Sequence, residues 1–353
     1  FSVVIKHRDG TVVQQVKRET LDHATREIAI SAMCRHPNII RFTKVIYADN
    51  RVDIYMDRYL CDLGHLLDGI QLNIPTAYRF IGDLLAGVEY LHARGIIHSD
   101  LKPGNLLIPH SMDKIVICDF NIAAVASEGE HSSCVQSVPY RAPEVDIGSD
   151  DTDDPSHHDQ SIDMWSVGCL IFEIFTGYLL MTNGDYALSP AVNAGILFRL
   201  DVTKPVDQIL ADVLNVDRVH AQRQIMIKTL TAVGAWAPIG DIRFMTHLIT
   251  DCLVGTRISA ADAVLRFTGA PEGVSVPTFT RSTITVPPIV LPNPLGEPEC
   301  LSDLRQKYRE LRSPAVGVAE HLYRGWLRNQ KQQLNSLNLD DREDAKIACI
   351  YIA

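Results

Sequence analysis

The sequence predicts an α+β protein with a small strand-rich lobe, a larger helical lobe and a helical extension at its C-terminal end. Residues 1–58 contain short apolar runs separated by turn residues, a pattern typical of strands. Residues 59–268 contain longer apolar repeats at helical spacing. Residues 269–300 are rich in proline, and a second helical pattern follows at 301–353. We therefore expect a two-lobed body, a linker and an extension.

Turn residues separate the expected elements of the small lobe. Val12–Gln15 and the polar stretch after it lead into an expected helix at about Leu21–Cys34. Two expected strands, Phe42–Tyr47 and Arg51–Met56, flank Ala48-Asp-Asn50, which favours a hairpin turn. This order predicts a small sheet with one helix.

Two long helices are expected in the large lobe. Between Pro75 and Arg94 the apolar residues recur on one face, and Gly95 is a suitable C-cap. The stretch Ser161–Thr176 is apolar on nearly all sides, which predicts a buried helix. Just before it, Asp146–Asp163 holds seven aspartates and two adjacent histidines. We prefer a solvated acidic loop over a metal site as the explanation of that composition.

The last part of the chain has its own helix signals. Seven prolines between Pro271 and Pro298 indicate an extended linker, because proline removes a backbone donor and restricts its neighbour. After it, Ser313-Pro314 is typical of a helix start, and Asp340 with Glu343 forms a capping pattern. Such short helices bury too little surface to be stable alone, so we expect them to dock on the body or to bind a partner.

Composition excludes several classes of protein. A net charge of −10 disfavours a general nucleic-acid binder and a binder of anionic membranes. The eight cysteines are scattered, without a C-x-x-C pair. The sequence shows no signal peptide and no apolar run long enough to span a bilayer. We therefore expect a soluble intracellular protein with free thiols and with neither a nucleic-acid nor a membrane partner.

The most informative stretch lies at residues 98–105 and reads H-S-D-L-K-P-G-N. Asp100 can orient and deprotonate a hydroxyl group, and Lys102, two residues on in an extended loop, can neutralise a transferring phosphate. Asn105 and Asp119, fourteen residues apart, offer hard oxygen ligands to Mg²⁺. An ordinary turn explains the tetrapeptide D-L-K-P alone. The whole ordered set instead indicates phosphoryl transfer.

This order resembles the eukaryotic protein kinase family, whose signature reads H-R-D-x-x-x-x-N followed by D-F-G. Other parts of the family pattern occur in the same order along the chain. They are the strand Phe1–Lys6, the segment Arg26-Glu27-Ile28 nine residues before His36-Pro-Asn, Ala142-Pro-Glu144, Asp163-Met-Trp, and Arg257. The resemblance covers roughly residues 1–268. It implies a two-lobed protein kinase-like fold that binds ATP and Mg²⁺.

The resemblance implies roles for residues around the phosphates. Lys6 is the lysine that binds the α- and β-phosphates of ATP and pairs with Glu27. The alternative explanation of Glu27 is a solvated charge on the helix surface. Ser137 lies where the family has a Ser or Thr that hydrogen-bonds the catalytic Asp and Lys. Glu144 and Arg257 match the family's ion pair at the end of the activation segment.

The resemblance also implies an adenine site. Met56 is the expected gatekeeper residue behind the adenine. Asp57 to Tyr59 is the expected hinge, whose backbone carbonyl and N–H groups hydrogen-bond the adenine edge. Leu107 is expected to pack under the adenine. The alternative is that Leu107 is only a residue of the hydrophobic core, and both roles can hold together.

Three departures from the family pattern stand out. Ser99 replaces the usual arginine, which reads a phosphate on the activation segment, so activation by phosphorylation is disfavoured. Asn121 replaces the glycine of D-F-G, and asparagine tolerates a positive φ better than most residues. No glycine-rich loop precedes Phe1 in this sequence. Either the sequence is a fragment or the loop is missing, so we expect residues 1–268 to form an N-terminally incomplete kinase domain.

These residues favour a serine/threonine protein kinase that uses Mg-ATP and protein substrates, with Asp100 as the catalytic base. The form D-L-K-x-x-N is that of serine/threonine kinases. Tyr140-Arg-Ala-Pro-Glu144 and Arg26-Glu-Ile28 favour the cyclin-dependent and MAP kinase branch. The alternative is a pseudokinase scaffold that binds partners through the acidic loop and the C-terminal helices.

A third alternative is a kinase fused to, or activated by, a cyclin-like helical module. Residues 315–327 and 345–353 resemble the start of a cyclin-like box, and generic amphipathic helices explain these segments equally well. If the resemblance holds, 301–353 is the start of such a box, and a cyclin-like or other activating partner is expected.

Overall fold

The computed structural model describes residues 2–6, 11–17, 21–48, 51–68, 70–125, 135–145, 159–181, 189–233, 236–271, 274 and 276. Within these ranges the side chains of residues 2–6, 17, 21–25 and 47–48 are not described. The expected acidic loop, apart from 159–163, lies outside the described residues. So do most of the linker at 269–300 and the whole extension at 301–353.

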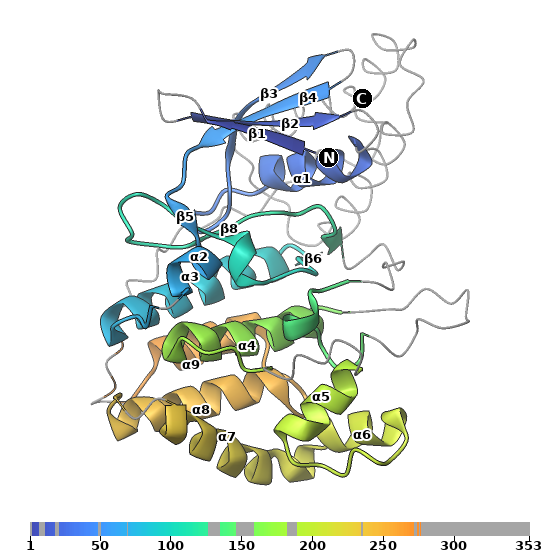
Figure 1. Cartoon of the computed structure of the whole chain (residues 1–353), viewed down its shortest axis with the longest axis vertical. Coiled ribbons are helices and arrows are strands. Elements are labelled where there is room, and N and C mark those ends of the chain that lie inside the picture. Colours follow the sequence, from blue (N-terminus) through green and yellow to red (C-terminus); the bar gives the residue numbers. More distant parts are fainter. Residues whose placement is uncertain are drawn as a thin grey trace, which may run out of the picture.

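The small lobe is one antiparallel sheet with a helix beneath it (Figure 1). Its strands are β1 (Ser2–Lys6), β2 (Thr11–Lys17), β4 (Arg51–Asp57) and β3 (Phe42–Ala48), in that spatial order. The helix is α1 (Leu21–Met33). The buried core of the small lobe consists of Val16, Ile28, Val52 and Ile54. Apolar packing therefore holds the sheet and the helix together.

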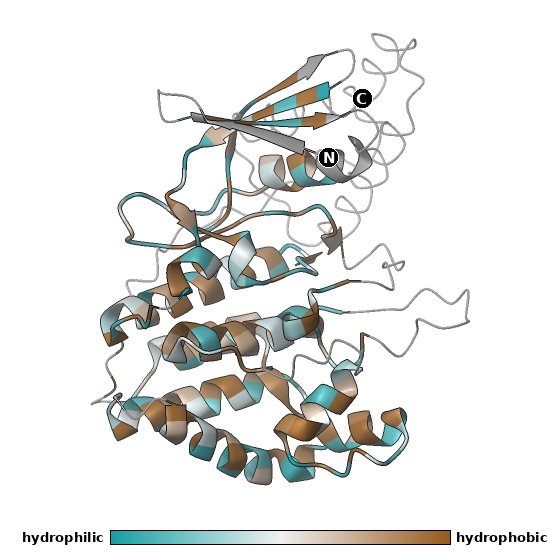
Figure 2. Ribbon diagram, viewed as in Figure 1, coloured by the Kyte–Doolittle hydropathy of each residue, from teal (hydrophilic) through white to brown (hydrophobic). Residues whose placement is uncertain are grey.

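The large lobe is built around α4 (Ser161–Thr176), whose limits are those predicted from its apolar composition. It packs against α3 (Ile74–His92) and α8 (Ile239–Leu253), and α3 packs against α9 (Ala260–Thr268). The remaining helices are α2 (Leu63–Leu67), α5 (Pro190–Leu197), α6 (Val206–Val213) and α7 (Val219–Val233). Figure 2 shows hydrophobic residues recurring along α4, in keeping with its burial.

The remaining elements are short strands and single turns. They are β5 (Cys61–Asp62), β6 (Ile96–Ile97), β7 (Leu106–Ile108), β8 (Val116–Ile117), β9 (Ala124–Val125), η2 (Pro103–Asn105), η3 (Val138–Tyr140) and η4 (Val216–Arg218). Strands β5, β7 and β8 form one antiparallel sheet, and β6 pairs with β9. The loops after β6 and β8 meet where the His98 ring contacts the Cys118 carbonyl.

The expected α+β class, with a small strand-rich lobe and a large helical lobe, is confirmed. The C-cap predicted for the helix at Pro75–Arg94, Gly95, is wrong. The C-cap of α3 is Ala93, whose N–H reaches the Glu89 carbonyl, and Gly95 lies two residues further on, with a φ of 71°. The helix ends earlier because the chain needs the Arg94–Gly95 turn to enter β6.

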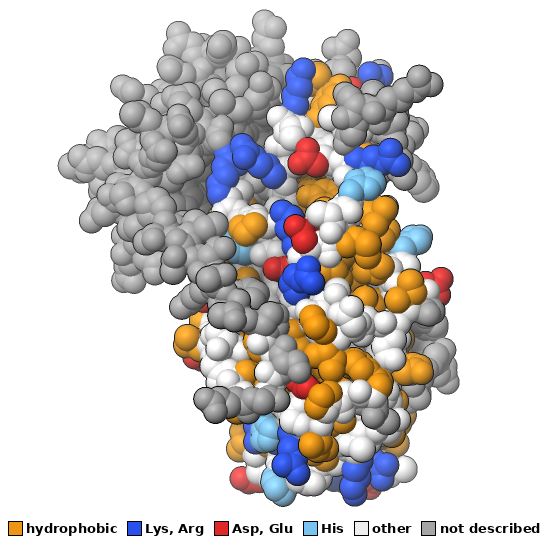
Figure 3. All heavy atoms as spheres, turned by 90° about the vertical axis from the view of Figure 1, so that its left-hand side faces the viewer, with side chains coloured by type: hydrophobic (Ala, Val, Ile, Leu, Met, Phe, Trp, Pro, Cys, Tyr) orange, Lys and Arg blue, Asp and Glu red, His pale blue; other side chains and the backbone are white. Residues whose placement is uncertain are grey.

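Hydrophobic side chains also gather on one outer face of the large lobe, as Figure 3 shows. Among the described residues, five that are large and apolar are more than half exposed: Ile70, Tyr178, Val216, Ile239 and Leu265. Exposed apolar side chains are normal at the surface of a folded protein, because there is not enough polar surface to cover it. No helix in the described part of the chain is long and apolar enough to cross a membrane.

Candidate active site

The loop after β6 is anchored from below by Asp163, which lies in the first turn of α4 and is fully buried. Its carboxylate accepts the backbone N–H groups of His98 at 2.8 Å and Ser99 at 2.9 Å, and the His92 ring at 2.9 Å. Burial alone would raise the pKa of Asp163, but the hydrogen bond and charge of His92 hold it below its ordinary value. The loop is thus fixed to the most buried helix of the large lobe.

His98 connects this loop to the strand-end segment that carries Asp119. Its Nε2 donates to the Cys118 carbonyl at 3.0 Å, and its Nδ1 accepts the Asp100 N–H at 3.2 Å. One ring nitrogen donates and the other accepts, so the geometry fits the neutral ring. The ring is fully buried and lies beside Phe120, with the ring centroids 5.1 Å apart.

Asp100, Lys102 and Ser137 form a closed ring of hydrogen bonds. Lys102 Nζ donates to Asp100 Oδ2 at 2.6 Å and to Ser137 Oγ at 3.0 Å. Ser137 donates to Asp100 Oδ1 twice, from its backbone N–H at 3.1 Å and from its hydroxyl at 2.9 Å. Residues that lie 35 positions apart in the sequence are therefore held around one carboxylate.

Asn105 and Asp119 lie next to this ring. Asn105 Nδ2 donates to the Asp100 carbonyl at 2.8 Å and to Asp100 Oδ2 at 3.2 Å, and the Asn105 carbonyl accepts the Cys118 N–H at 2.9 Å. Asp119 Oδ1 accepts from Asn121 Nδ2 at 2.5 Å. Among the described residues, no donor is hydrogen-bonded to Asn105 Oδ1 or to Asp119 Oδ2. An amide oxygen and a carboxylate oxygen left open in this way suit Mg²⁺.

The expectation for Asn121 needs a correction. The positive φ in this segment lies at Asp119, at 67°, and Asn121 is not among the described residues with a positive φ. Aspartate tolerates this conformation because its short polar side chain bonds locally. The Asn121 side chain instead holds Asp119 from two residues away. The substitution of the family's glycine thus adds a hydrogen bond rather than relieving backbone strain.

Glu27 lies on α1 and is only 6% exposed. Burial and then the negative charge of Asp119 raise the pKa of Glu27 to about 8. Its expected partner, Lys6, ends β1 opposite Val12, but the Lys6 side chain lies outside the described part. The neighbouring Arg26 donates to the Ala123 carbonyl at 3.0 Å, which ties α1 to the segment after Asp119.

The expected adenine-site residues lie along the connection between the lobes. Met56 pairs with Val12 and Phe42 in the sheet and packs partly buried against the main core. Asp57 is exposed at the end of β4. Tyr59 is partly buried, and burial followed by the charge of Asp57 raises its pKa to about 12. Leu107 lies in the middle of β7, half-buried.

One backbone hydrogen bond brings the hinge and Leu107 together. The Leu60 N–H donates to the Ile108 carbonyl at 2.8 Å. Leu107 itself pairs with Asp62 and Val116 in the sheet. The segment from Asp57 to Tyr59 therefore runs beside β7.

The predicted pair between Glu144 and Arg257 is confirmed. Both guanidinium Nη groups contact the Glu144 carboxylate, and the bond from Nη2 to Oε2 measures 2.7 Å. Arg257 also donates to the Ser161 carbonyl at 3.0 Å and lies over the Trp165 ring. Its side chain is 3% exposed and that of Glu144 is 24% exposed. The pair ties the segment after Ser137 to α4.

Sequence reasoning named Asp163 only as part of the family pattern, without its role in holding the site, and it missed Gln136. A carboxylate at the start of an otherwise apolar helix is a usable signal, since buried charges need partners. Gln136 is 4% exposed and makes six hydrogen bonds through its backbone and side chain. A single glutamine in a loop gives no such signal, because its partners come from three different parts of the chain: the Ser99 loop, residues 141–142 and the start of α4.

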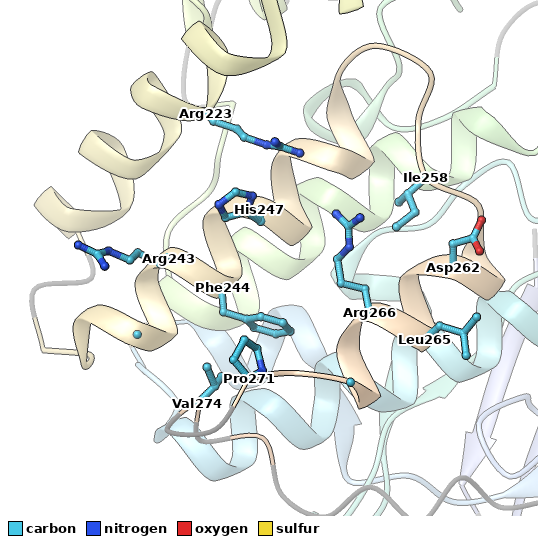
Figure 4. A pocket seen from close by; sticks show the side chains of 12 residues that line it. Arg223, Arg243, Phe244, His247, Ile258, Asp262, Leu265, Arg266, Pro271 and Val274 are labelled. Atoms are coloured by element: carbon cyan, nitrogen blue, oxygen red, sulfur yellow. The ribbon is translucent and has the colours of Figure 1, made fainter.

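A hollow of about 1060 Å³ opens between α7, α8 and α9 (Figure 4). Arg223 and Arg266 reach it from opposite sides, and both pair with Asp251. His247 also lines it, and burial and then the charge of Arg223 lower its pKa. Figure 1 places these helices at the end of the large lobe away from the sheet. We assign the arginines a structural role, because they join three helices through one carboxylate.

Comparison with known proteins points to the same family as the sequence motifs. A family model described as the protein kinase domain matches residues 2–219. Mitogen-activated protein kinase 12 of Mus musculus is 34% identical over 169 residues, which are 46% of this chain and 44% of that protein. Cell division control protein 2 homolog 1 of Trypanosoma brucei brucei is 33% identical over 202 residues, which are 53% of this chain and 64% of that protein.

A third relative is cyclin-dependent kinase 17 of Caenorhabditis elegans, 33% identical over 183 residues, which are 50% of this chain and 25% of that protein. The chain thus spans less than half the length of the mitogen-activated protein kinases that it matches. The matched relatives belong to the two groups that the sequence motifs favoured.

Proposed function

The chain belongs to the protein kinase family, and on that premise we propose that it is an active serine/threonine kinase. The reaction is transfer of the γ-phosphate of ATP to Ser or Thr hydroxyl groups of protein substrates. The related MAP and cyclin-dependent kinases support this class of transferase. The single observation that carries the proposal is the hydrogen-bonded ring of Asp100, Lys102 and Ser137.

In the proposed mechanism, Asp100 is the base that orients the substrate hydroxyl and takes its proton. Its carboxylate already has a fixed direction, because Ser137 and Lys102 hold the two oxygens separately. Lys102 carries a positive charge 2.6 Å from that carboxylate, where it can neutralise charge that develops on a transferring phosphate. Preorganisation of this kind lowers the barrier because the groups need not rearrange during the reaction.

Asn105 and Asp119 are the proposed ligands of Mg²⁺, through the two oxygens that accept no recorded hydrogen bond in the described part. When bound, Mg-ATP supplies the phosphoryl group and neutralises its charge. Lys6 is proposed to hold the α- and β-phosphates and Glu27 to pair with Lys6. Met56, the segment from Asp57 to Tyr59, and Leu107 are proposed to surround the adenine. Residues 1–268 are the proposed kinase domain.

The test is transfer of radiolabelled phosphate from ATP to a generic Ser/Thr protein substrate by the full-length protein. We expect Asp100→Asn to reduce the rate by about 10²–10⁴-fold, as for loss of a general base. Asp119→Asn should also reduce it severely, through loss of a metal ligand. Asp217→Asn, on the exposed η4 turn, is the matched control and should leave the rate unchanged. Equal incorporation by all four proteins would refute the assignment.

The pseudokinase scaffold is the second candidate, and the replacement of the family arginine by Ser99 is the observation that favours it. A scaffold of this kind would bind ATP or a partner without transferring phosphate. Wild-type protein that binds Mg-ATP but labels neither itself nor any substrate would support that alternative. A cyclin-like or other activating partner stays part of the kinase proposal, and assays should include a cyclin-type protein.

A further inference from the structure

Gln136 is the residue before Ser137 and has more fixed contacts than its place in a loop requires. It has a left-handed backbone, with a φ of 65°, and is nearly fully buried. Its backbone N–H donates to the Ser99 carbonyl at 2.9 Å. Its carbonyl accepts two hydrogen bonds from Arg141, from Nε at 3.1 Å and from Nη2 at 2.8 Å.

Both the nitrogen and the oxygen of the Gln136 side-chain amide have hydrogen-bond partners. Nε2 donates to the Ile162 carbonyl at 2.8 Å and to Ser166 Oγ at 2.9 Å. Oε1 accepts the Ala142 N–H at 2.8 Å. Ser166 Oγ in turn donates to the Tyr140 carbonyl at 2.7 Å, which fixes the direction of the chain of bonds. Gln136 therefore joins the loop of Ser99, the segment before Glu144, and α4.

Only a primary amide of this length meets all three partners. A glutamate cannot donate to the Ile162 carbonyl, and a methionine of similar size leaves that carbonyl and the Ala142 N–H without partners. A buried group left unsatisfied is costly. The left-handed backbone at Gln136 is also unfavourable for a non-glycine residue, so the conformation persists only while its contacts hold it.

The contacts of Gln136 lead directly to the catalytic ring. Ser137, the next residue, gives Asp100 two hydrogen bonds. Ser99, the residue before Asp100, is held by Gln136 from one side and by Asp163 from the other. Any rotation of the Gln136 backbone would move Ser137 away from Asp100. This connection needs no charged group at position 99.

We propose that Gln136 is a positioning residue that holds the end of the activation segment (residues 119–144) in its productive arrangement by neutral hydrogen bonds. This arrangement takes the place of a phosphate read by an arginine. The inference rests on the proposed kinase function. The enzyme is therefore active without phosphorylation of that segment.

The experiment compares Gln136→Met with Gln222→Met in the full-length protein. Gln222 is a matched control, because it is buried in α7 and donates to the Val213 carbonyl at 2.9 Å, away from the site. We expect Gln136→Met to lower kcat by about 10- to 100-fold, the order expected for a misplaced reacting group, with an unchanged KM for ATP. Gln222→Met should lower thermal stability and leave kcat unchanged.

Hydrogen exchange of residues 135–145 is the second readout. We expect faster exchange there in Gln136→Met and unchanged exchange in Gln222→Met. Ser166→Ala removes one partner of the Gln136 side chain and should give the same effects at a smaller size. It replaces Gln136→Met in the experiment if that variant does not fold. Phosphatase treatment of the wild type should leave its rate unchanged.

Two results would overturn the proposal. One is a kcat within twofold of wild type together with unchanged exchange of 135–145 in Gln136→Met. The other is a loss of roughly tenfold or more on phosphatase treatment, traced to a site on the activation segment. If the wild type transfers no phosphate, the kinase function fails. The exchange measurement then still decides whether Gln136 holds the segment.

Discussion

The ion pair between Glu144 and Arg257 gives the most quantitative prediction. Removal of Glu144 strands a guanidinium whose side chain is 3% exposed and whose remaining recorded acceptor is the Ser161 carbonyl. Breaking a buried pair from one side costs about 3–5 kcal/mol, so we expect Glu144→Gln to lie in that range. Arg257→Ala strands a carboxylate that is 24% exposed, and water offsets part of the cost. It should lie near the lower limit, about 3 kcal/mol.

Urea denaturation measures these free energies of unfolding directly. The matched control is Arg218→Ala, whose pair with Asp212 measures 3.1 Å and whose side chain is 43% exposed. A surface pair of this kind contributes little to stability, because water screens it, so Arg218→Ala should be nearly as stable as wild type. In the double variant Glu144→Gln with Arg257→Met, neither charge of the pair remains. Its loss in free energy of unfolding should therefore be smaller than the sum of the losses of the single variants. Single variants as stable as the control, or a fully additive double variant, would show that the pair is not coupled as described.

Three further predictions concern other parts of the chain. Because the pKa of Glu27 is raised to about 8 from an ordinary 4.5, its contribution to stability is full below pH 4.5 and is lost as the pH rises through about 8. Glu27→Gln should therefore lose less thermal stability than wild type between about pH 5 and pH 9, and parallel curves would contradict this. A Cβ at Gly168 would lie 2.7 Å from the Leu253 side chain, so Gly168→Ala should cost about 1–3 kcal/mol in urea denaturation. Gly104→Ala meets nothing within 4 Å and is the control, and equal losses would contradict the packing. Limited proteolysis should cut first within 271–298 and release a kinase core, and cleavage inside 301–353 with a protected linker would contradict the proposed linker.

The parts of the fold that the sequence predicted correctly are those with strong local patterns. The helix Ser161–Thr176 has the predicted limits, because continuous apolar composition and burial coincide there. The end of α3 was predicted less well, since a glycine with a positive φ also occurs in the turn beyond a C-cap. Helices α5 to α7 were expected only as part of a mostly helical region.

The site was predictable where its residues are close in sequence. Asp100, Lys102 and Asn105 lie within six residues and contact one another as their spacing indicated. Ser137 was placed by family resemblance, and the structure brings it to Asp100. The role of Gln136 was not predictable, because its partners meet it only after the chain has folded around α4.

The most direct test of the central proposal is one single-turnover measurement of phosphate transfer, with ATP affinity measured on the same wild-type and Asp100→Asn samples. We predict that Asp100→Asn binds Mg-ATP as tightly as wild type, because Asp100 is not a proposed ligand of the nucleotide or the metal. Its transfer rate should fall by about 10²–10⁴-fold. Transfer at the wild-type rate by Asp100→Asn, or a rate that falls only in proportion to lost ATP affinity, would contradict the assignment of Asp100 as the catalytic base.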